Sequence, residues 1–177
     1  MLNNKGQIFT TDLIVALTVL LFILVISATS FGLIQNSLNE EEFYAEMQEK
    51  AVNASQVLVA TKGNPDSWVK LNDLTGINSI GLAKENNVLD ENKVDTLVDW
   101  NALKYEEIKE VLGLQKYDFY FKITEMDEHT VREFGILPGA EEKTILVERY
   151  ILFQGTERKF ILGVFKWKDL KKRKKLV

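Results

Sequence analysis

The sequence contains no cysteine, one histidine and two prolines in 177 residues. Without cysteine, the chain can form no disulfide framework, no thiolate zinc site, no iron–sulfur cluster and no cysteine nucleophile. His129 alone cannot supply the three or four ligands of a usual transition-metal site, so we expect no metal and no cofactor. The sequence also lacks GxSxG, P-loop, dinucleotide-binding and HExxH motifs. These absences predict a protein that is not an enzyme.

Acidic residues outnumber basic ones except at the carboxyl terminus. The chain has a net charge of −4, but residues 168–175 hold six basic residues and one acid, so this segment carries +5 and the rest −9. We take 168–177 as a basic tail, which is either a solvated terminus or a contact with membrane lipid or another subunit. Nucleic acid is not an expected partner, because the rest of the chain is acidic. The residues of this candidate contact are Lys171, Lys172, Arg173, Lys174 and Lys175.

A long apolar run follows the amino terminus. Residues 13–34 contain no charge, and 22 residues of helix suffice to cross a hydrocarbon core of about 30 Å. The run is longer than the core of an ordinary secretory signal, so we predict a transmembrane segment, with cleavage near Ala28 as the alternative. Lys5 and the amino terminus precede the span, and five glutamates follow it between residues 40 and 49. The positive-inside rule therefore predicts a single-pass protein with a cytoplasmic amino terminus and an extracellular head.

The helix is predicted to continue beyond the membrane. Residues 36–61 contain no proline or glycine, and their apolar side chains recur at helical spacing. Gly63 and Pro65 then end the pattern, because glycine favours a left-handed cap and proline cannot continue a helix. The prediction is one helix over residues 7–62, apolar first and amphipathic later. The amphipathic stripe is Tyr44, Met47, Ala51, Ala54 and Leu58.

Residues 63–167 are predicted to form an α+β head. Asp90 and Asn101 are the expected N-caps of two short helices, and from Tyr117 the apolar period changes from 3.6 to 2, which is typical of a half-buried strand. Residues 125–142 are interpreted as an acidic loop. Two apolar runs around residues 154–157 predict an antiparallel hairpin. Because these runs are apolar on both faces, we expect an antiparallel sheet covered by the long helix on one side and by smaller elements on the other.

The residues before the span carry the most specific signal. Lys5, Gly6 and Gln7 lead into the apolar run, and Asp12 is the one acid at its edge. This arrangement resembles the class III signal peptide of archaeal type IV pilin-like proteins. Three further segments, 63–68, 79–83 and 117–121, are similar to segments of pilin-like proteins from methanogenic archaea.

The resemblance implies a specific fate for the apolar helix. A membrane prepilin peptidase would cut between Gly6 and Gln7, removing residues 1–6 as a leader and leaving the helix in the mature protein. In pilins such helices form the core of a fibre. Other pilin-like subunits, the peptidase and membrane lipid are then the expected partners. Pilins commonly place their acid fifth in the mature chain, whereas Asp12 would be sixth here.

Two site residues have alternative interpretations. Asp12 either neutralises the new amino terminus of a neighbouring subunit, since unpaired charge in hydrocarbon is costly, or caps its own helix. Asn53 begins an Asn-Ala-Ser sequon and is a candidate for N-glycosylation, or it is an ordinary helix-surface asparagine.

Together these features predict a structural subunit of an archaeal type IV pilus-like surface filament. The head size and the altered position of the acid favour a minor or specialised pilin or pseudopilin with an adhesive role. The alternative is a single-pass membrane-anchored extracellular binding domain that does not polymerise.

Overall fold

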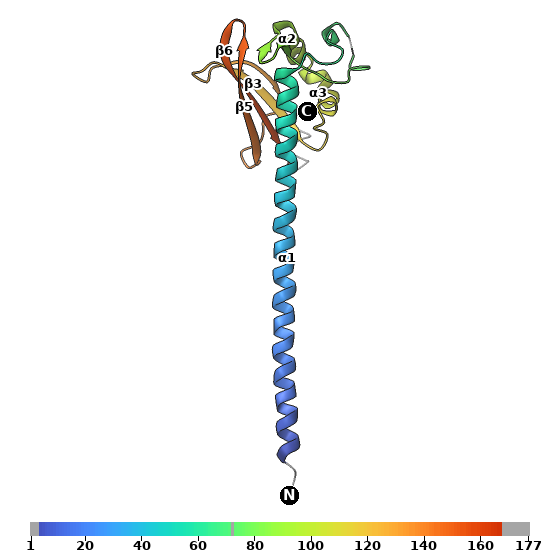
Figure 1. The fold of residues 1–177 in the computed structure, drawn as a ribbon, viewed down its shortest axis with the longest axis vertical. Helices are drawn as coiled ribbons and strands as arrows, with labels where there is room; N and C mark the ends of the chain where they lie inside the picture. Colours follow the sequence, from blue (N-terminus) through green and yellow to red (C-terminus); the bar gives the residue numbers. More distant parts are fainter. Residues whose placement is uncertain (1–3, 72, 168–177) are drawn as a thin grey trace. The chain divides into compact units, whose positions relative to one another are not determined.

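The structure is a computed structural model that describes residues 4–71 and 73–167, with side chains described for 12–35, 38–71, 73–100 and 103–167. Its fold class is α+β, with one long helix and one six-stranded sheet (Figure 1). The chain divides into two compact units, Met1–Tyr44 and Ala45–Val177. The first unit is helical throughout its described part, and the second unit is the head.

The helix α1 runs from Asn4 to Ala60. The prediction of one long helix through the apolar and amphipathic regions is therefore confirmed, with an end two residues earlier than expected. Gly63 follows with a φ of +83°, a backbone conformation that glycine adopts without steric cost. Within the described residues, α1 is the one helix that is long and apolar enough to cross a membrane.

The head contains one sheet in the strand order β1-β2-β5-β6-β3-β4. The strands are β1 (Ala83–Glu85), β2 (Val88–Leu89), β3 (Asp118–Thr124), β4 (Thr130–Gly135), β5 (Thr144–Phe153) and β6 (Thr156–Phe165). The predicted hairpin is confirmed as β5 and β6, joined by Gln154 and Gly155 with φ values of +54° and +74°. Positive φ at both residues is the requirement of the tight turn that matches the sheet's twist.

Two expectations for the sheet are wrong. The sheet is mixed rather than antiparallel, because β2 runs parallel to β5. Asn87 explains this pairing: its N–H donates to the Val59 carbonyl and its C=O accepts from the Leu152 N–H, which fixes the turn before β2 between α1 and β5. The expected acidic loop also contains β4, whose side chains give little apolar alternation because Phe134 alone is fully buried.

Three short helical elements complete the head: η1 (Trp68–Lys70), α2 (Glu91–Asp99) and α3 (Asn101–Val111). The prediction of Asp90 as an N-cap is confirmed, since its carboxylate accepts hydrogen bonds from the N–H groups of Asn92 and Lys93. The N-cap of α3 is Trp100, one residue before the expected Asn101.

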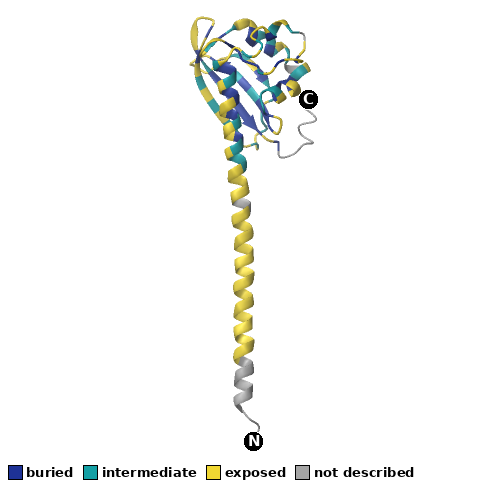
Figure 2. Ribbon diagram, turned by 45° about the vertical axis from the view of Figure 1, so that its right-hand side comes forward, coloured by how far each residue is buried: buried dark blue, intermediate teal, exposed yellow. Residues whose placement is uncertain are grey.

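In the head, α1, α2 and α3 lie against one face of the sheet. Ser55 of α1 accepts a hydrogen bond from Arg149, which lies opposite Phe160 in the sheet register, and Tyr105 of α3 stacks on Phe119 at 5.4 Å. Figure 2 shows the buried residues gathered on this side. The predicted helical stripe is confirmed in the head, where Met47, Ala51, Ala54 and Leu58 are buried.

The opposite face of the sheet has no second layer among the described residues, which corrects the expectation of smaller elements there. Leu146 and Tyr150 of β5 point to this face and are 55% and 69% exposed. The ring of Tyr120 covers part of this face, because it lies over Gly163. A Cβ added to Gly163 would be 2.2 Å from the ring. An aromatic ring over a glycine on the neighbouring strand shields backbone that would otherwise face water.

A buried hydrogen-bond network holds α3 on the first residues of β3. The Tyr105 hydroxyl accepts from the Phe119 N–H at 2.8 Å and lies 3.1 Å from the Phe119 carbonyl, to which it donates. Lys109 donates to Asp118 at 3.2 Å, and both side chains are almost fully buried. Burial of the Tyr105 hydroxyl raises its pKa far above the ordinary value, so it stays protonated.

We expect Tyr105→Phe to destabilise the head by about 1–3 kcal/mol, because the buried Phe119 N–H loses its acceptor. The measurement is denaturant unfolding of the full chain in detergent, followed by near-UV circular dichroism. Tyr150→Phe is the matched control, since Tyr150 is exposed. Equal stability of the two variants would contradict the assigned role of Tyr105.

Candidate functional site

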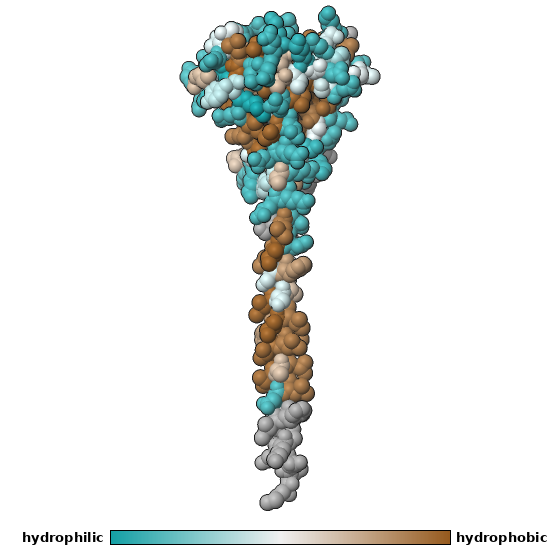
Figure 3. All heavy atoms as spheres, viewed as in Figure 1, coloured by the Kyte–Doolittle hydropathy of each residue, from teal (hydrophilic) through white to brown (hydrophobic). Residues whose placement is uncertain are grey.

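The first candidate site is the surface of α1 before the head. Every residue from 12 to 35 is exposed, although the segment is almost entirely apolar (Figure 3). Two of its hydroxyls are satisfied within the helix: Thr18 donates to the Ile14 carbonyl at 2.8 Å, and Thr29 donates to the Val25 carbonyl at 3.1 Å. Such internal bonds remove the need for water at these side chains. The surface is therefore suited to hydrocarbon or to other apolar helices.

The predicted leader residues lie in the first turns of α1. Lys5, Gly6 and Gln7 have helical backbone, and their side chains are outside the described set. Asp12 is exposed, and eight helical residues precede it. An N-cap must stand at the start of its helix, so the capping alternative for Asp12 is wrong.

The sequon at Asn53 combines an exposed asparagine with a buried serine. Asn53 lies on the exposed side of α1, whereas Ser55 is fully buried. The Ser55 hydroxyl donates to the Val52 carbonyl at 2.8 Å and accepts from the Arg149 Nε at 3.0 Å. The folded head therefore does not present the serine of this sequon at its surface.

Two further sequence candidates are His129 and the basic tail. His129 is exposed in the turn before β4, where its N–H donates to Asp127 and its Nδ1 lies 3.0 Å from the Thr130 carbonyl. No group of three or more potential metal ligands occurs among the described residues. The basic residues Lys171, Lys172, Arg173, Lys174 and Lys175 lie outside the part of the chain that the structure describes.

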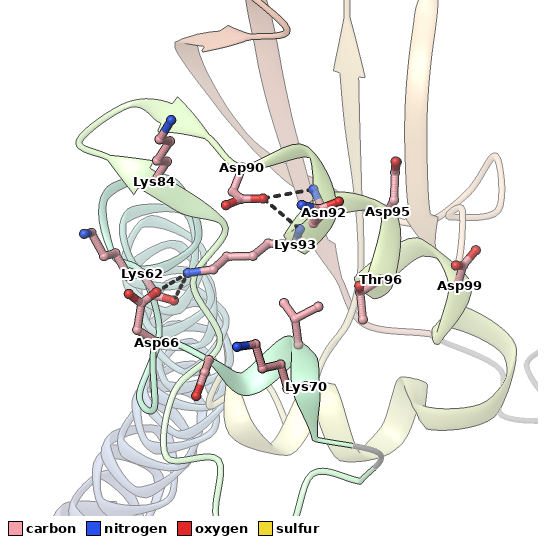
Figure 4. Close-up of a pocket in the computed structure, with 12 residues that line it drawn as sticks. Lys62, Asp66, Lys70, Lys84, Asp90, Asn92, Lys93, Asp95, Thr96 and Asp99 are labelled. Carbon is pink, nitrogen blue, oxygen red and sulfur yellow. Dashed lines mark hydrogen bonds and ion pairs between the residues drawn. The ribbon is translucent and has the colours of Figure 1, made fainter.

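A second candidate site is a hollow in the head, which the sequence did not predict. Its volume is about 680 Å³, and it lies between the end of α1, η1, β1 and α2 (Figure 4). Its lining is mostly polar and charged: Lys62, Asp66, Ser67, Val69, Lys70, Lys84, Asp90, Asn92, Lys93, Asp95, Thr96 and Asp99.

Lys93 is the central side chain of this hollow. It extends from α2 toward the end of α1, and its side chain is 8% exposed. Its ammonium donates to the Lys62 carbonyl at 2.8 Å and forms an ion pair with Asp66. Because a buried cation needs such partners, these contacts fix the end of α1 to the first turn of α2. The same contact with Lys93 lowers the pKa of Asp66 below its ordinary value of 3.8.

One feature of the sequence points in part to the hollow. Asp90 was expected as an N-cap, and capping places Lys93 in the first turn of α2. The other lining residues come from segments that sequence patterns do not place together, because their proximity depends on the course of the loop between α1 and β1. Within that loop, Gly63 and Gly81 allow a close approach: a Cβ on Gly81 would lie 2.1 Å from the Thr61 carbonyl.

Comparisons with known proteins add no relative. No protein-family profile, no curated protein and no solved structure matches this chain.

We expect the ion pair of Asp66 to give the head a pH-dependent stability. Since the pKa of Asp66 is lowered by folding, its contribution is present above the ordinary value of 3.8 and is lost as the pH falls through the lowered value. Asp66→Asn should therefore lower the melting temperature at about pH 7, and its difference from the parent should shrink and disappear as the pH falls below the ordinary value of 3.8.

Asp99→Asn is the control for this experiment, because it removes the same charge from the opposite side of the hollow without loss of a described hydrogen bond. Its melting temperature at about pH 7 should equal that of the parent. A pH-independent effect of Asp66→Asn would contradict the ion-pair explanation.

Proposed function

We propose that this chain is a membrane-anchored subunit of a type IV pilin-like surface filament, cut after Gly6 and assembled through α1. The observation that carries the proposal is the uniformly exposed apolar surface of residues 12–35. A soluble protein rarely exposes a contiguous apolar patch larger than a few hundred Å². This surface therefore calls for hydrocarbon or for other helices around it.

The energetics support insertion of this segment into a bilayer. Residues 13–34 include 15 leucine, isoleucine, valine and phenylalanine side chains. At about −0.3 to −0.6 kcal/mol each near the centre of the membrane, they favour insertion by on the order of 5–9 kcal/mol. Asp12 stands at the end of the run, where a charge is less costly than at the centre.

Other features of the same helix support association with its neighbours. Ala28 and Gly32 are four residues apart, and a Cβ on Gly32 would meet nothing within 4 Å. Small residues at this spacing let another helix approach closely within a membrane. Asp12 lies within α1, with helical residues before and after it, and its side chain is exposed. It is therefore available to pair with the amino-terminal cation of a second copy.

The head is built to remain outside this apolar environment. Its core is internal to the unit Ala45–Val177, and the acidic residues Glu40, Glu41, Glu42 and Glu49 are exposed on α1. Charges at this position favour water over lipid. In the proposed topology the head is extracellular and supplies the adhesive surface of a minor or specialised subunit.

We expect the mature protein in native membranes to begin at Gln7. The measurement is mass spectrometry of the amino-terminal peptide from membranes and from sheared surface filaments. Gly6→Leu should abolish the shortening, whereas Ala28→Leu, which blocks a small-residue secretory cleavage site, should not. An intact Met1, or a start beyond Ser27, would overturn the proposal.

We expect Asp12→Asn to leave cleavage and membrane insertion intact and to reduce filament recovery by tenfold or more. Asparagine keeps the size and the carbonyl acceptor of the side chain but removes the charge, so the variant tests charge pairing alone. Asp12→Glu should retain assembly. Normal filaments from the asparagine variant would exclude the pairing role. A protein that inserts but never enters filaments would favour the membrane-anchored binding domain instead.

A further inference from the structure

We propose that the hollow around Lys93 binds a small hydroxylated anion, an acidic sugar carrying a carboxylate or a phosphate. This inference concerns the head alone and does not rest on filament assembly. Its volume of about 680 Å³ is within the about 300–1,000 Å³ typical of small-ligand sites. Most of its lining residues are lysines and aspartates, so we argue the ligand from these charges.

The lining contains four lysines and four aspartates, but most of its carboxylates are already engaged. Asp66 pairs with Lys93, Asp90 caps α2, and Asp95 accepts from the Arg132 Nε at 2.7 Å. Only the fourth, Asp99, has no hydrogen bond or ion pair among the described residues.

Fewer of the lysines than of the aspartates in the hollow have a hydrogen bond or an ion pair through the side chain. Within the described part of the chain, the ammonium groups of Lys62, Lys70 and Lys84 form no hydrogen bond and no ion pair. Three lysines and two aspartates of the lining therefore have no ion-pair partner among the described residues, since the cap of Asp90 satisfies hydrogen bonds without neutralising its charge. Of these lysines, Lys62 also acts through its charge on Asp66, whose pKa it helps to lower. Because lysine has a flexible four-carbon stem, these ammonium groups can turn toward an anion in the hollow.

The two sides of the hollow differ in chemistry. Figure 4 shows Lys62 at the end of α1, Lys70 on η1 and Lys84 on β1, and it shows Thr96 and Asp99 on the side of α2. The lysine side suits a carboxylate or a phosphate. The α2 side offers a carboxylate and a hydroxyl, which can bond to the hydroxyl groups of a sugar. A ligand with an anionic group at one end and hydroxyls at the other matches both sides.

Lys93 holds the segments that line the hollow in a fixed arrangement. Its ammonium is held by the Lys62 carbonyl and by Asp66, so the segments that carry Lys62 and α2 keep their separation. Preorganised surroundings reduce the entropy cost of binding a small ligand.

The test uses the full-length protein in nonionic detergent and isothermal titration with three probes of equal ring size: glucuronate, glucose 6-phosphate and glucose. We expect saturable binding of at least one anionic probe, with a Kd on the order of 1 mM, and at least tenfold weaker binding of glucose. Binding of glucuronate alone identifies a carboxylate ligand, and binding of the phosphate alone identifies a phosphorylated one.

The diagnostic variant is Lys70→Gln with Lys84→Gln, and its matched control is Lys122→Gln with Lys159→Gln on the uncovered face of the sheet. Both pairs remove two positive charges, so they alter long-range electrostatics equally. The diagnostic pair should weaken anion binding at least tenfold and the control pair less than twofold. Equal weakening by both pairs, equal binding of glucose, or no saturable binding below about 10 mM would overturn the proposal.

Discussion

The helix α1 is one continuous helix with an exposed apolar part and a part that is buried in the head. The remaining structure depends on this difference. Its early part exposes apolar side chains in every direction, and exposure of so much apolar surface to water is unfavourable. Its last turns, from Ala45, have a buried stripe and belong to the core of the head. A single element therefore joins a folded domain to a segment that is long and apolar enough to span a membrane, which is the physical basis of the proposed anchoring and assembly.

Inside the head, buried polar contacts fix the positions of the helices relative to one another and to the sheet. Apolar packing alone is less specific. Lys93 joins the end of α1 to α2, and Tyr105 with Lys109 joins α3 to the start of β3. Each network satisfies groups that would otherwise be costly to bury, so each permits few alternative arrangements. The polar hollow forms where the first of these networks keeps two segments apart.

The helices on one face of the sheet also explain what the other face offers. Leu146 and Tyr150 remain exposed because α3 and the part of α1 in the head pack against the inner side. The head thus has a mixed apolar and charged surface on one side and the polar hollow at the end of α1. These are different chemical environments, and lysines and aspartates form most of the lining of the hollow.

Features with a long or regular signal could be predicted from the sequence. The uninterrupted apolar run and the absence of helix breakers up to Gly63 predicted α1, and the alternation after Tyr117 predicted β3. The hairpin around Gln154 followed from two apolar runs and a glycine turn. The weak apolar alternation of residues 130–135 concealed β4, since Phe134 is its one fully buried side chain.

The sequence by itself determined the existence of the long helix, the α+β class and the lack of cysteine or clustered histidine chemistry, because these depend on local pattern and composition. The tertiary structure alone decided that Asp12 lies inside α1 and not at its cap, that Ser55 is buried, and that β2 runs parallel to β5. It also assembled the hollow around Lys93. The reason is physical: those features depend on helix boundaries and on contacts between distant segments, which periodicity cannot encode.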